Sequence, residues 1–115
     1  MARYTSWFTV EVPPTRLQQL LIEVLQTCNL DIVYHTSDYI MAQEMPGKSP
    51  FARLVVVEVL TDKTMNSTTE TRINIVVKNE ELPLQMNNHC YQMFQQVNQA
   101  IADNHQWQLI ESICG

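Results

Sequence analysis

The chain has 115 residues, of which 45% are hydrophobic, and a formal net charge of -5 from 7 basic and 12 acidic side chains. These values predict one globular domain over residues 1–115 and exclude a disordered chain. Because the only glycines are Gly47 and Gly115, the chain cannot form the glycine-rich loops that hold nucleotide phosphates.

The cysteines and the hydropathy pattern indicate a compartment. Cys28, Cys90 and Cys114 are far apart and form no CxxC motif, which favours a reducing environment and excludes a zinc ribbon. The first residues contain no apolar run typical of a signal peptide. Residues 82–102 lack charge but contain eight amides, which a lipid bilayer would not accommodate. We therefore expect a cytoplasmic protein that makes no membrane contact.

The N-terminal part predicts a strand followed by a helix. Apolar and polar side chains alternate over residues 3–12, which is typical of a strand, and Pro13 ends it. From Leu17 to Cys28, apolar side chains recur every three or four residues, as on an amphipathic helix. Asn29 is the residue expected to end this helix in a left-handed conformation.

The middle of the chain predicts four strands. Residues 30–34 and 39–45 form two of them, joined by a polar turn, and a loop follows at residues 46–50. Residues 52–60 and 69–78 form the other two. Because strands joined by short turns are antiparallel neighbours, we expect one antiparallel sheet.

The C-terminal part predicts a second helix, which Asn87 or Asn88 would cap. Its apolar stripe is spaced as one helix face: Cys90, Met93, Phe94, Val97 and Ile101. Residues 107–114 form an apolar tail, expected either as a last strand or as a segment packed over the helix.

Together these elements predict an α+β fold of order β-α-β-β-β-β-α, with a short C-terminal strand or tail. Two amphipathic helices need an apolar surface, so we expect a single curved antiparallel sheet with both helices on one face. Over residues 3–102 this order is similar to one repeat of the TATA-box-binding-protein-like (TBP-like) fold and to small helix-grip domains. The resemblance is one of element order and implies the fold, not the function.

No set of side chains predicts catalysis. His89 and Cys90 are adjacent, so on a helix they point about 100° apart, and Cys90 belongs to the apolar stripe. His35, His89 and His105 show none of the spacings typical of metal ligands. We therefore expect no catalytic residue, no metal site and no cofactor, and hence a protein that is not an enzyme.

The sheet face turned away from the helices is the first candidate binding surface. Alternation places on it a mixture of aromatic, aliphatic and charged side chains: Trp7, Thr9, Leu54, Val56, Glu58, Arg72 and Asn74. Such a mixture suggests that something covers this face, whether the C-terminal tail, a second copy, a partner protein or a small ligand. Glu58 and Arg72 are expected to form a structural cross-strand ion pair.

The C-terminal third is the second candidate surface. Residues 1–78 carry all 7 basic side chains, whereas residues 79–115 carry four acidic side chains and no basic one. We expect a docking surface formed by Glu80, Glu81, His89, Gln92 and Gln96. The dispersed basic residues and the negative net charge argue against binding to nucleic acid.

These observations favour a non-enzymatic cytosolic adaptor or regulatory domain that acts through protein contacts, as a homodimer or with another protein. The alternative is a small helix-grip-like domain that binds a hydrophobic small molecule.

Overall fold

A computed structural model describes residues 2–12, 14–45, 54–62, 70–80, 89–103 and 108–114 of the chain. The elements follow one another as β1 (Ala2–Glu11), α1 (Pro14–Thr27), β2 (Leu30–His35), β3 (Tyr39–Glu44), β4 (Val56–Asp62), β5 (Glu70–Asn79), α2 (His89–Ala102) and β6 (Gln108–Cys114). The predicted order β-α-β-β-β-β-α is confirmed, and the C-terminal segment is a strand.

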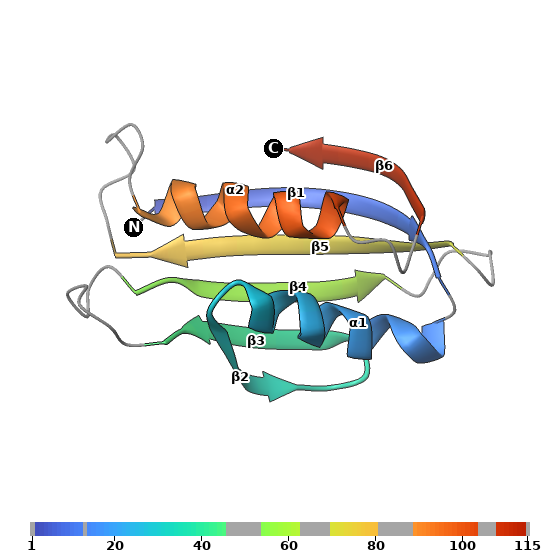
Figure 1. Cartoon of the computed structure of the whole chain (residues 1–115), viewed down its shortest axis with the longest axis horizontal. Helices are drawn as coiled ribbons and strands as arrows, with labels where there is room; N and C mark the ends of the chain where they lie inside the picture. Colours follow the sequence, from blue (N-terminus) through green and yellow to red (C-terminus); the bar gives the residue numbers. More distant parts are fainter. Residues whose placement is uncertain are drawn as a thin grey trace.

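The strands form one six-stranded sheet of order β2-β3-β4-β5-β1-β6, in which all neighbours are antiparallel. β1 lies between β5 and β6, so the first and last strands of the chain are side by side (Figure 1). Because β6 pairs with β1 along its edge, the C-terminal segment extends the sheet.

Both helices cover the same face of the sheet (Figure 1). The reason is visible in the sequence: each helix has one apolar stripe, and alternate residues of each strand are apolar. Phe8 of β1 is opposite Ile73 of β5, and Val59 of β4 is opposite Ile75. These side chains are buried beneath α1 and α2, where they form one core with Leu21 and the other apolar helix residues.

α1 ends where the sequence predicts. Asn29 adopts φ 65°, and it is the only residue other than glycine with a positive φ in the described part of the chain. The amides of Cys28 and Asn29 donate to the carbonyls three residues earlier, so the last turn tightens before the chain reverses. Asn tolerates this left-handed conformation better than most residues do.

The predicted strand boundaries agree with the structure to within about one residue, except in β4. The sequence predicts a strand over residues 52–60, but β4 begins at Val56, where it pairs with Gln43 of β3. Residues 52 and 53 lie outside the described residues, as do the loop 46–50 and the cap positions Asn87 and Asn88. In the ranges that are described, no helix is long and apolar enough to cross a membrane.

Candidate functional site

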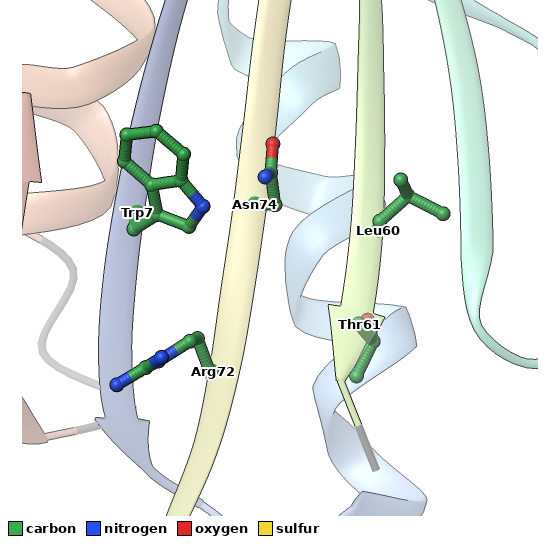
Figure 2. A pocket seen from close by; sticks show the side chains of 5 residues that line it. All are labelled: Trp7, Leu60, Thr61, Arg72 and Asn74. Atoms are coloured by element: carbon green, nitrogen blue, oxygen red, sulfur yellow. The ribbon is translucent and has the colours of Figure 1, made fainter. Parts of the chain in front are cut away.

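The open face of the sheet, which is the face opposite the helices, carries the first set of predicted residues. Trp7 of β1 and Leu60 of β4 both lie opposite Asn74 of β5, and Thr9 lies opposite Arg72. Directly opposed residues of antiparallel strands share a face. Figure 2 shows this side of the sheet, with the helices behind the strands. The predicted alternation is therefore confirmed here.

Burial across the open face is uneven. Thr9, Leu54 and Val76 are less than one-tenth exposed, although they carry no helix above them. By contrast, Leu60 is 49% exposed and Tyr34 of β2 is 56% exposed. Exposed apolar area therefore concentrates toward β2, β3 and β4.

Four neighbouring side chains form this exposed area, which we call the Tyr34 patch: Tyr34, Tyr39, Met41 and Leu60. Tyr34 lies opposite Met41, and Tyr39 lies opposite Leu60. The rings of Tyr34 and Tyr39 are 6.1 Å apart between centroids, within the range of aromatic pairs. Sequence reasoning missed this patch because it followed the alternation of β1, β4 and β5 only.

Glu58 is held by two neighbours on the open face. Its Oε1 forms an ion pair with Lys78 Nζ, and the hydroxyl of Tyr39 donates a hydrogen bond to its Oε2 at 2.9 Å. The hydrogen bond from Lys78 lowers the pKa of Glu58, with a smaller contribution from Tyr39, although partial burial opposes the change. Burial and the Glu58 carboxylate raise the pKa of the Tyr39 hydroxyl.

The prediction of an ion pair between Glu58 and Arg72 is wrong. Glu58 lies opposite Val76, which is four residues from Arg72, or roughly 13 Å along a strand. Lys78 is only two residues from Val76, so it is the diagonal neighbour that a long side chain can reach. Strand register, which the sequence alone did not fix, decides this pairing.

Arg72 instead borders an open depression. The depression has a volume of about 310 Å³ and is lined by Trp7, Leu60, Thr61, Arg72 and Asn74. In Figure 2 the Arg72 side chain extends toward β1, and the nitrogen-bearing edge of the Trp7 indole is turned toward Asn74. Arg72 is exposed and makes no ion pair with any carboxylate whose side chain the structure describes. The Oδ1 of Asn74 is buried and accepts no hydrogen bond.

A contact that sequence reasoning missed joins β3 to α2. His89 Nε2 lies 2.7 Å from Oε1 and 2.8 Å from Oε2 of Glu44, and the Val55 amide donates to Oε1 at 3.2 Å. Glu44 is only 8% exposed. It follows Ile40 and Ala42 in the alternation of β3, so its carboxylate faces the helices and needs a partner there. The place of Glu44 on the helix-facing side of β3 is the feature of the sequence from which this contact could have been predicted.

Cys90 is buried, as predicted, and its Sγ lies 3.5 Å from the carbonyl oxygen of Val77. His89, the first residue of α2, contacts Glu44, so the adjacent thiol and imidazole have different partners. Cys28 is also buried, and burial raises the pKa of its thiol. In the described part of the chain, no three His, Cys, Asp or Glu side chains gather as metal ligands would.

The predicted docking surface of the C-terminal third is only partly described. Glu80, Gln92 and Gln96 are exposed, whereas Glu81 lies outside the described residues. The side chain of His89 is 20% exposed and turned toward Glu44, which leaves little of it on the surface. No protein-family model matches the chain, and none of the curated proteins compared with it does.

Proposed function

We propose that the protein is a non-enzymatic adaptor or regulatory domain that acts through protein contacts, and that its open sheet face pairs with a second copy of the chain. The Tyr34 patch carries this proposal. Tyr34 and Leu60 are each about half exposed on a face that β6 does not cover, because β6 lies beside β1. Exposed aromatic and aliphatic side chains in contact with one another are typical of interface cores.

Charged residues of both signs lie on the open face beside this patch. Arg3, Arg72 and Lys78 share the face with Glu11, Asp31 and Glu58, and the register also places Asp62 opposite Arg72, Glu70 opposite Glu11 and Glu111 opposite Thr9. Because both signs are present, a second copy of the chain could set basic residues against acidic ones across the proposed contact.

The alternative, a helix-grip cavity for a hydrophobic small molecule, has less support. Such a cavity would lie between the helices and the sheet. That layer holds Ile73, Ile75, Val97 and Ile101, whose side chains are fully buried against one another. A ligand there would have to displace close-packed core side chains.

Sedimentation velocity over a concentration series tests the proposed dimer. The wild type is expected to sediment as a dimer at micromolar concentration. Tyr34→Lys places a charge in the patch and is expected to give a monomer, because an unpaired charge is costly in an interface. Gln96→Lys adds the same charge on the exposed face of α2 and serves as the matched control.

Both variants change exposed residues, so circular dichroism should show an unaltered fold. A wild type that stays monomeric throughout the series contradicts the proposal. If the dimer persists in Tyr34→Lys but dissociates in Gln96→Lys, the interface lies on α2 instead, and this result also contradicts the proposal.

A further inference from the structure

Residues of like charge lie directly opposite each other at both ends of the ladder between β1 and β5. At one end Arg3 lies opposite Lys78, and at the other end Glu11 lies opposite Glu70. Like charges in directly opposed positions destabilise an antiparallel pair of strands. Both ends of the ladder are therefore stabilised by contact with charges of the opposite sign.

The chain itself supplies only part of this compensation. Lys78 forms an ion pair with Glu58, and the charge of Arg3 also acts on this carboxylate, so two basic side chains share one acidic side chain. Arg3 and Glu11 are exposed, and neither forms an ion pair with a side chain that the structure describes. Both remain available to a partner.

The two charged ends are equally far from an uncharged row of residues that crosses the sheet. Trp7 lies opposite Asn74, and each of them is four residues from both ends of the ladder, or roughly 13 Å along a strand. The row continues through Leu60 to Tyr39, two members of the Tyr34 patch. Figure 2 shows Trp7, Asn74 and Leu60 on their neighbouring strands.

We infer that the two copies of the proposed dimer are related by a two-fold axis that follows this uncharged row, so that their strands are antiparallel. The inference rests on the proposed contact between open faces. Packed sheets keep their strands aligned to within about 30°, so the axis runs either along the strands or across them. An axis along the strands keeps the acidic ends of the two copies together, whereas an axis across them exchanges the ends.

The axis across the strands sets opposite charges against each other. A two-fold interface is self-complementary, so each residue of the uncharged row meets its own copy. Arg3 of one copy then faces Glu11 of the other, and Lys78 faces the position of Glu70. Each of these contacts occurs twice in the dimer.

The same arrangement gives Arg72 a partner. Arg72 and Val76 are each two residues from Asn74, on opposite sides of it, so Arg72 of one copy lies against Val76 of the other. Glu58 lies directly opposite Val76, roughly 5 Å away on the neighbouring strand, and the register places Asp62 beside Arg72 in its own chain. Arg72 then lies beside both acidic residues, including the Glu58 that is out of reach within one chain.

Charge reversal on β1 tests the arrangement by sedimentation velocity at low ionic strength. Arg3→Glu sets acidic residues against each other at both equivalent contacts, and Glu11→Arg sets basic residues against each other. Each variant alone is expected to dimerise at least about tenfold more weakly than the wild type. An equimolar mixture of the two variants is expected to regain the affinity of the wild type, because every arginine then faces a glutamate.

Arg16→Glu and Glu23→Arg make the same changes of charge at exposed positions of α1 and serve as matched controls. Both are expected to dimerise as the wild type does. If mixing restores no affinity, or if Arg3→Glu and Glu11→Arg each dimerise as the wild type does, the antiparallel arrangement is overturned while the proposed dimer stands. A wild type that stays monomeric overturns both.

Discussion

Glu58 links the charge of the open face to stability. Its ordinary pKa is 4.5, and the contacts with Lys78 and Tyr39 lower this value in the folded chain. The ionised carboxylate therefore stabilises the fold above about pH 4.5, and this contribution disappears as the pH falls through the lower, folded-state pKa.

Glu58→Gln is accordingly expected to lower the free energy of unfolding at pH 7 by about 1 kcal/mol. The difference from the wild type should shrink at acidic pH, once the folded-state carboxylate is protonated. Urea unfolding of both proteins at several pH values measures it, with Glu11→Gln on the same face as the control. A difference that grows toward acidic pH would show that the pKa change has the opposite sign.

The contact between Glu44 and His89 also has a predictable effect on the free energy of unfolding. His89→Ala leaves the buried Glu44 carboxylate without its imidazole partner, so we expect a loss of about 2 kcal/mol in the free energy of unfolding. His35→Ala, at an exposed position of β2, should change stability by less than about 0.5 kcal/mol.

A double-mutant cycle with Glu44→Gln isolates the coupling between the two side chains. The effect of His89→Ala should be smaller in Glu44→Gln than in the wild type, because no buried charge remains. Additive effects of the two changes would mean that the contact contributes nothing to stability.

At the scale of elements, the end of α1 gives a direct test of backbone conformation. Because Asn29 has a φ of 65°, Asn29→Ala should cost about 1 kcal/mol, whereas Asn29→Gly should change stability little. Urea unfolding measures both. Equal stability of the Ala and Gly variants would show that position 29 does not need the left-handed conformation.

The elements themselves follow from local patterns, which is why most were predictable. Alternation identified the buried face of β1, and the spacing from Leu17 to Cys28 identified α1. The start of β4 was not predictable in this way, because Leu54 and Val55 are as apolar and branched as the residues that follow. Pairing with β3 decides where the strand begins.

At the scale of the whole molecule, the sequence predicted the open face but not the contacts on it. Alternation placed Trp7, Glu58 and Arg72 on one face, yet their partners depend on register between strands far apart in the chain. The same holds for Glu44 and His89, which are 45 residues apart. The Tyr34 patch depends on the pairing of β2 with β3 and on the bulge between Ile32 and Tyr34, which alters the alternation.

The central claim is that two copies meet through the open face. Two sheets packed face to face lie about 10 Å apart. Their helices would then lie on the outer sides, and each helix layer adds roughly 10 Å. Labels on α2 of the two copies would therefore be at least about 30 Å apart, whereas labels on the open face would be much closer.

Distance measurement between spin labels on the two copies tests this arrangement most directly. The labels are placed at Asp31→Cys, an exposed position of the open face outside the Tyr34 patch, and, in a second protein, at Gln96→Cys on α2, each with Cys114 replaced by Ser. We predict a shorter distance between the two Asp31→Cys labels and a distance at least about 10 Å longer between the two Gln96→Cys labels. A shorter distance at Gln96→Cys, or no distance between copies at either position, would contradict the proposed pairing through the open face.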